Sequence, residues 1–241
     1  MDKDYWAQFE WGKYPQWLLK KVNELERLQN TSLFVRHSAR EEPDRIEDTH
    51  GAQLTEAGKE AAFQFGQELN PAFSYRIFHS HVKRCEDTAF GIQQGAKNAG
   101  IQIGELQPKH ELNMILSDEK ALMPLLARDQ EPFIYYWMGG HYPNHRVEST
   151  LSLAHRIHEL LLENQETNQN QYLDLYVTHD FQLILLMFHW AATINSKDWV
   201  YYLDGFLCHL HPTTLNIRYH EESLEIPHPS WWNSGNHHYL S

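Results

Sequence analysis

Short apolar runs that end in polar residues alternate along the chain with longer stretches in which apolar residues recur every three or four positions. Each short run has the length of a strand that is buried on both faces. The runs occupy residues 32–37, 76–80 and 173–179. The longer stretches predict helices over residues 55–69, 82–96, 148–163 and 181–192, with Thr55 as the N-cap of the first. This alternation predicts an α/β fold with a mostly parallel sheet.

Three further segments complete the expected organisation. Residues 1–30 form an aromatic-rich extension, in which the apolar spacing from Trp17 to Leu28 predicts an amphipathic helix packed on the domain. Residues 31–241 are expected to form one domain. Prolines and a glycine pair interrupt residues 104–147, which predicts an inserted lid of short helical pieces. Two strand-like runs, 205–211 and 214–219, flank Pro212-Thr213 and predict a terminal hairpin.

Composition narrows the classes of partner. Hydrophobic residues make up 41% of the chain, which is enough for a sizeable core. The formal net charge of −12 disfavours a binder of nucleic acid or of anionic membranes, so an anionic substrate needs a local basic pocket. No apolar run is long enough to span a bilayer, no secretion signal is evident, and Cys85 and Cys208 offer no disulfide framework. A cytoplasmic location is expected, and no pattern calls for a cofactor or a metal.

Candidate chemistry gathers at the polar ends of the predicted strands, where open α/β sheets place ligands. The residues there are Arg36, His37, Arg40, Arg84, His179 and Asp180. Guanidinium groups bind phosphate oxygens bidentately and offset the charge that spreads over those oxygens during transfer. The strand ends therefore predict a phosphate pocket.

The two histidines and the carboxylate in this set also allow catalysis. A histidine attacks phosphorus only as neutral imidazole, and neighbouring arginines are expected to lower the pKa of His37 and keep one of its nitrogens free. Asp180 is the candidate general acid for the leaving group, a contribution of about 10² to 10⁴ in rate, and then the base that activates water. These residues predict transfer of a phosphoryl group to His37.

These motifs resemble those of a known family. Arg36-His37-x-x-Arg40, followed by Pro43, resembles the signature of the histidine phosphatase superfamily, and His179-Asp180 resembles the His-Asp pair of its acid-phosphatase branch. Ser80-x-x-x-Arg84 and Leu54-Thr55-x-x-Gly58 are similar to further segments of the family. The resemblance implies a phosphoglycerate-mutase-like three-layer sandwich. It also implies His37 as nucleophile, Asp180 as proton donor, and a phosphate pocket of Arg36, Arg40, Arg84 and His179.

Two positions bear on this resemblance. Ser38 stands where the family usually has glycine, which predicts crowding of the turn beneath the phosphate. The other branch of the family, which includes phosphoglycerate mutases, takes its acid from a glutamate in the lid half. Glu111 is the candidate there, and it ranks below Asp180.

Several alternatives stay open. The chain is expected to hydrolyse a phosphorylated small molecule or a phosphoprotein, but a catalytically weak relative that binds such a ligand, or a mutase or phosphotransferase, fits the same arginines.

His81 and Lys83 lie near the predicted pocket and are expected to be solvated. The candidate leaving-group residues in the lid are Trp137, His141, Tyr142, His145 and Arg146. The pairs His155/His158 and His209/His211 are expected to be surface or core histidines rather than metal ligands. Trp231-Trp232 begin a tail that binds a partner or folds over the lid.

Overall fold

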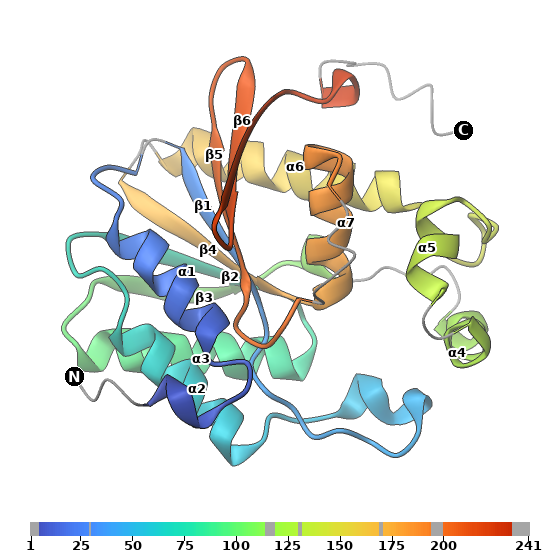
Figure 1. Cartoon of the computed structure of the whole chain (residues 1–241), viewed down its shortest axis with the longest axis horizontal. Coiled ribbons are helices and arrows are strands. Elements are labelled where there is room, and N and C mark those ends of the chain that lie inside the picture. Colours follow the sequence, from blue (N-terminus) through green and yellow to red (C-terminus); the bar gives the residue numbers. More distant parts are fainter. Residues whose placement is uncertain are drawn as a thin grey trace.

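Four neighbouring strands run parallel through half of a seven-stranded sheet, and three antiparallel strands extend its other edge (Figure 1). The computed structural model describes residues 5–28, 30–113, 119–129, 132–168, 171–193 and 200–232. The sheet order is β3-β2-β4-β1-β5-β6-β7. The strands are β1 (Thr31–Arg36), β2 (Ser74–His79), β3 (Ile103–Pro108), β4 (Tyr172–Thr178), β5 (Gly205–Leu210), β6 (Thr214–Tyr219) and β7 (Glu222–Pro227). The predicted α/β class and its largely parallel sheet are confirmed.

Helices cover both faces of the sheet. On one face lie α1 (Lys13–Asn23), α2 (Glu56–Gln67) and α3 (Lys83–Asn98), and on the other lie α6 (Thr150–Asn168) and α7 (Asp180–Ala191) (Figure 1). The segment between β3 and α6 carries η3 (His110–Leu112), α4 (Glu119–Asp129) and α5 (Phe133–Met138). Short 3₁₀ turns η1 (Trp6–Gln8), η2 (Ile46–Gly51) and η4 (Ser230–Trp232) complete the described part. None of the described helices has both the length and the apolar character needed to cross a membrane.

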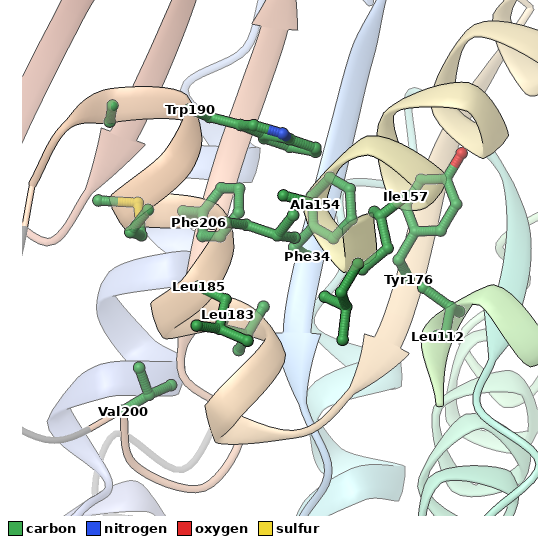
Figure 2. Close-up of a cluster of buried hydrophobic side chains, with 14 of the residues drawn as sticks. Phe34, Leu112, Ala154, Ile157, Tyr176, Leu183, Leu185, Trp190, Val200 and Phe206 are labelled. Atoms are coloured by element: carbon green, nitrogen blue, oxygen red, sulfur yellow. The ribbon is translucent and has the colours of Figure 1, made fainter. Parts of the chain in front are cut away.

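Alternation along the central strands sorts the core into two layers. In β1, Leu33 and Val35 pack against α1, α2 and α3, whereas Phe34 faces α6 and α7. Phe34 stacks on Tyr176 of β4, with ring centroids 4.7 Å apart, and on Phe206 of β5, at 5.1 Å. Figure 2 shows these three rings with Trp190 of α7 and Ile157 of α6. Both faces of β1 are thus buried, which explains its uninterrupted apolar run.

The predicted helix at the N-terminus differs from the observed one. α1 spans Lys13–Asn23 rather than residues 17–28, because Pro15 is tolerated in a first turn and the backbone leaves the helix after Asn23. Leu25 and Leu28 are still buried, outside the helix. Apolar spacing therefore identified the buried positions correctly but not the end of the helix.

Two strands were missed. β3 lies inside the region predicted as lid, so the first residues of that region belong to the sheet. β7 follows the predicted hairpin and pairs with β6. Both are edge strands with exposed polar side chains, and neither shows the apolar run by which the buried strands were recognised.

Candidate active site

The six predicted site residues meet at the carboxyl ends of β1 and β4. Arg36 ends β1 and His37 follows it. His179 joins β4 to α7, Asp180 is the first residue of α7, and Arg84 lies in the first turn of α3. Because β1 and β4 are parallel neighbours, their polar ends lie side by side. The His37 and His179 rings have centroids 5.4 Å apart. The structure therefore brings together residues that lie far apart in the sequence.

The ring of His37 is oriented by its own backbone neighbour. Its Nδ1 lies 2.8 Å from the carbonyl oxygen of Ser38. A carbonyl oxygen only accepts, so Nδ1 carries the proton and Nε2 keeps a free lone pair. Arg84 Nε donates to this Nε2 over 3.0 Å. The lone pair of Nε2 thus points toward the guanidinium that is expected to hold phosphate.

Burial keeps His37 neutral. The side chain is 2% exposed, and burial is the largest cause that holds the pKa of His37 well below its usual value of 6.5. The charges of Arg36 and Arg84 lower this pKa further. The predicted direction of the shift is confirmed, but desolvation contributes more than the neighbouring arginines.

Arg84 connects the two histidines. Its Nη2 lies 3.1 Å from His179 Nδ1, which must accept because a guanidinium has no acceptor. His179 Nε2 is then protonated and donates to Ser80 Oγ over 3.1 Å, and Ser80 Oγ donates to Asn113 Oδ1 over 2.6 Å. This chain fixes the His179 tautomer.

Arg36 is almost completely enclosed, with 8% of the residue exposed. Its Nη2 lies 3.0 Å from Asp180 Oδ2, and its Nη1 donates to the Val200 carbonyl over 2.7 Å. The ring of Tyr202 covers one face of the guanidinium, with Cζ 4.4 Å from the ring centroid. Asp180 therefore takes part in the site as the ion-pair partner of Arg36.

Arg40 lies at the rim. Its Nη1 lies 3.2 Å from a carboxylate oxygen of Glu42 and donates to the Glu41 carbonyl over 2.9 Å. Glu42 also accepts the hydroxyl of Tyr202. Arg36 and Arg40 are therefore each paired with a carboxylate, and a phosphate bound at both guanidinium groups would replace these pairs.

The hydroxyl of Ser38 is hydrogen-bonded to the backbone of α2. Its side chain is fully buried and donates from Oγ to the Gly58 carbonyl over 2.6 Å, and its N–H donates to Thr88 Oγ1 over 2.9 Å. Thr55 Oγ1 accepts the Gly58 N–H over 2.9 Å, which confirms the predicted N-cap. At Gly58 a Cβ would lie 2.0 Å from the Ala39 carbonyl oxygen, so the glycine allows α2 to approach the loop after His37.

His81 and Lys83 are engaged with neighbours outside the pocket. His81 is exposed and its Nδ1 lies 3.3 Å from Asn113 Nδ2. Lys83 Nζ lies 2.8 Å from Asp87 and 3.2 Å from Glu86, one turn along α3. Glu111 lies in η3, where Oε2 is buried without a hydrogen-bond partner and lies 3.4 Å from His110 Nδ1.

The candidate leaving-group residues lie in three different settings. Trp137 is buried and donates from Nε1 to the Glu148 carbonyl over 2.6 Å, so it links α5 to the segment before α6. His141, Tyr142 and Arg146 line a cavity of about 350 Å³, together with Leu125, Arg128, Tyr136 and Pro143. His145 is exposed.

The remaining histidine pairs have other partners. His158 stacks on Trp232, with centroids 3.9 Å apart, and His155 Nε2 lies 3.3 Å from Glu159. His209 Nδ1 is hydrogen-bonded to Thr31 Oγ1 over 2.8 Å. Trp231 and Trp232 thus pack against α6, while residues 233–241 of the predicted tail lie outside the described residues.

Sequence reasoning missed Asn113, Val200 and Tyr202. Asn113 and Tyr202 support site residues through side chains, and Val200 does so through its carbonyl, so none belongs to a recognisable motif. Their positions depend on how η3 and the segment before β5 fold onto the sheet. No local signal in the sequence identifies them.

Solved structures with the same fold have low sequence identity to the chain. Bacillus stearothermophilus YhfR matches with 18% identity and a TM-score of 0.57, and the match covers 76% of this chain and 92% of that chain. A mycobacterial glucosyl-3-phosphoglycerate phosphatase matches with 14% identity, 83% and 98% coverage, and a TM-score of 0.52. A phosphoglycerate mutase from Bacillus anthracis matches with 14% identity, 82% and 91% coverage, and a TM-score of 0.51. No curated protein matches the chain.

A match to a family profile shows to which branch of the superfamily the chain belongs. The profile described as histidine phosphatase superfamily (branch 1) matches residues 32–213, a range that contains all six predicted site residues. The expected membership of the acid-phosphatase branch is therefore wrong. That expectation rested on the two-residue motif His179-Asp180, and two adjacent residues carry far less information than a match over most of the chain. The chain belongs to branch 1 of the histidine phosphatase superfamily.

Proposed function

We propose that the chain is a phosphatase that hydrolyses a phosphomonoester through a phosphohistidine intermediate on His37. The observation that carries this proposal is the state of His37: a neutral ring, oriented by Ser38 through Nδ1, whose Nε2 lone pair faces Arg84. A pocket that only bound phosphate would not need an unprotonated nucleophile at this place. Neutral His37 is the group that phosphoryl transfer requires.

The pocket supplies the charge that a phosphate dianion needs. Arg36, Arg40 and Arg84 offer guanidinium groups, and their present partners are Asp180, Glu42 and the two histidines. A phosphate that binds here replaces these partners, which frees Nε2 of His37 from Arg84. His179 is the fourth proposed contact to phosphate. The whole chain is acidic, so this pocket is the basic site that an anionic substrate requires.

The reaction proceeds in two steps. In the first, His37 Nε2 forms a bond to phosphorus, the ester P–O bond breaks, and the leaving oxygen takes a proton from Asp180. In the second, water attacks the phosphohistidine and gives a proton to Asp180. The P–N bond then breaks, which returns neutral His37 and releases inorganic phosphate. The carboxyl group is thus regenerated in each cycle.

The ion pair between Asp180 and Arg36 couples proton donation to substrate binding. In the free protein this pair favours the ionised carboxylate, which has no proton to give. When phosphate takes Arg36, Asp180 loses its cationic partner and gains an anionic neighbour, and both changes favour a carboxyl group that holds a proton. Asp180 is therefore proposed to take up a proton as the substrate binds.

The first experiment is hydrolysis of p-nitrophenyl phosphate, with excess EDTA, by the wild type and by His37→Ala. We expect release of phosphate by the wild type and none by the variant, together with acid-labile label on His37 after incubation with ³²P-labelled substrate. Activity that survives in His37→Ala would overturn the proposal. Added alcohol tests the acceptor: transfer to the alcohol in place of water would indicate a phosphotransferase, the reaction class of the relative named a mutase.

A second comparison tests the proton donor. p-Nitrophenolate leaves without much help, whereas the more basic phenolate of phenyl phosphate needs a proton. Asp180→Asn should therefore lose about 10² or more in kcat on phenyl phosphate and much less on p-nitrophenyl phosphate. Glu111 is the competing candidate acid in the branch to which the chain belongs, and we expect Glu111→Gln to change kcat by the same factor on both esters. The reverse result would assign the acid to Glu111.

A further inference from the structure

The N-terminal segment lies outside the range that matches the family, yet it contacts the loop beside the phosphate pocket. The match begins at residue 32, whereas η1, Trp11 and α1 precede it. Trp11 meets the ring of Tyr202 edge-on, with centroids 5.8 Å apart. Tyr14 stacks on Tyr201, with centroids 4.4 Å apart and planes 9° apart. Two aromatic residues of this segment thus hold two consecutive tyrosines.

The loop that carries these tyrosines wraps around Arg36. The Val200 carbonyl accepts from Arg36 Nη1 over 2.7 Å, and the Asp204 carbonyl accepts from the Arg36 N–H over 2.8 Å. Between them, Tyr202 covers the guanidinium face at 4.4 Å, and Leu203 adopts a left-handed φ of 53°. The loop therefore contacts Arg36 at its backbone, at one side-chain nitrogen and over one face.

Tyr202 is also linked to Arg40, through Glu42. Its hydroxyl donates to Glu42, and a carboxylate oxygen of Glu42 lies 3.2 Å from Arg40 Nη1. Burial raises the pKa of Tyr202, and the bond to Glu42 raises it further, so the hydroxyl keeps the proton that it donates. One side chain is thus linked to Arg36 through its face and to Arg40 through its hydroxyl.

We propose that Tyr202 is a positioning residue that presets Arg36 and Arg40 for phosphate, and that Trp11 and Tyr14 hold its loop in place. A free arginine side chain loses rotamer entropy when it is fixed, and a site that fixes it beforehand binds phosphate more tightly. The N-terminal segment is on this view a structural part of the phosphate pocket. The inference rests on the proposed role of the two arginines in binding phosphate.

The test measures binding of inorganic phosphate by calorimetry, beside KM and kcat for p-nitrophenyl phosphate. Tyr202→Leu removes ring and hydroxyl and should weaken phosphate binding about tenfold, with a similar rise in KM. Tyr202→Phe keeps the stack on Arg36 and should stay within about threefold of the wild type. Trp11→Leu removes the ring that meets Tyr202 edge-on and should weaken binding severalfold. Phe90→Leu, an exposed aromatic on α3, is the matched control and should leave binding unchanged.

The outcomes separate this inference from the proposed function. A wild type that binds no phosphate and releases none from the ester would overturn the proposed function itself. A wild type that binds, with Tyr202→Leu and Trp11→Leu binding equally well, would overturn the positioning role alone. A purely structural role would lower the melting temperature of these variants without changing the Kd for phosphate. If Tyr202→Leu fails to fold, the Kd of Trp11→Leu for phosphate still tests the positioning role, because unchanged binding in that variant would overturn it.

Discussion

At the scale of single residues, the proposed phosphoryl transfer depends on the ionisation of His37. Burial and the neighbouring charges of Arg36 and Arg84 hold its pKa well below 6.5, so we expect the ring to stay neutral as the pH falls below 6.5. The measurement is an NMR titration of ¹⁵N-labelled histidine, with the His37 signal assigned by its loss in His37→Gln. A midpoint near 6.5 would mean that the ring is not shielded as the structure shows. It would also remove the main support for a nucleophilic role.

Ser38 acts on stability rather than on chemistry. Its hydroxyl is directed to the Gly58 carbonyl and is fully buried. Ser38→Ala removes this bond and should lower the free energy of unfolding by about 1 kcal/mol, while kcat stays within about twofold. Urea unfolding and ester hydrolysis measure the two effects. Ser74→Ala, at an exposed hydroxyl, should change both less, and a large loss of kcat in Ser38→Ala would place the hydroxyl in the reaction.

At the scale of elements, α2 and α3 pack with their backbones in close contact. A Cβ at Gly66 would lie 2.0 Å from the Ile92 carbonyl oxygen, and one at Gly95 would lie 1.9 Å from the Phe63 carbonyl oxygen. Alanine at either position forces the helices apart and should lower the free energy of unfolding by about 1 to 3 kcal/mol. Denaturant unfolding measures this loss.

A matched glycine in a strand serves as the control for this packing. In Gly104→Ala the new Cβ has its nearest neighbour at 3.6 Å, an ordinary contact, so this variant should be close to the wild type. If all three variants were equally stable, the close approach of α2 and α3 would be wrong. Because α3 carries Arg84 and α2 begins at the loop after His37, Gly66→Ala and Gly95→Ala should also weaken phosphate binding.

At the scale of the whole molecule, buried histidines predict a loss of stability in acid. Burial is the largest cause that lowers the pKa of His158, His189 and His209 to about 4. In the unfolded chain a histidine titrates near 6.5, so the unfolded state binds more protons between about pH 6.5 and pH 4. Stability is therefore fully present above pH 6.5 and falls as the pH drops toward 4. Urea unfolding at pH 7.5 and 5.5 should show this fall.

His158 allows this prediction to be tested at one position. It is 4% exposed and stacks on Trp232. The lowering of its pKa corresponds to a loss of about 3 kcal/mol in the free energy of unfolding once the pH has fallen below the folded-state pKa. His158→Gln removes the titration and should flatten the dependence of stability on pH, even though loss of the stack lowers stability at pH 7.5. His145→Gln, at an exposed position, should leave the slope unchanged. Equal slopes in all three proteins would show that His158 does not contribute.

The sequence by itself determined the elements that are buried on both sides and the residues at their ends. β1, β2 and β4 were recognisable because a strand covered on both faces must be apolar throughout, and their polar ends marked the site. β3 and β7 were not predicted because an edge strand does not need an uninterrupted apolar run. The family resemblance was also evident from these ends, although a two-residue motif pointed to the wrong branch.

Only the tertiary structure decided how the site residues are held. Arg36 could be singled out as a candidate phosphate ligand, but its partners Asp180, Val200 and Tyr202 come from segments far along the chain. The same holds for Asn113, which supports His179 through Ser80. The physical reason is that the type of a candidate site residue can be read from the sequence around it. The residues that hold its side chain in place depend on which surfaces come into contact when the sheet and its helices pack. The local spacing of residues does not show which surfaces these are.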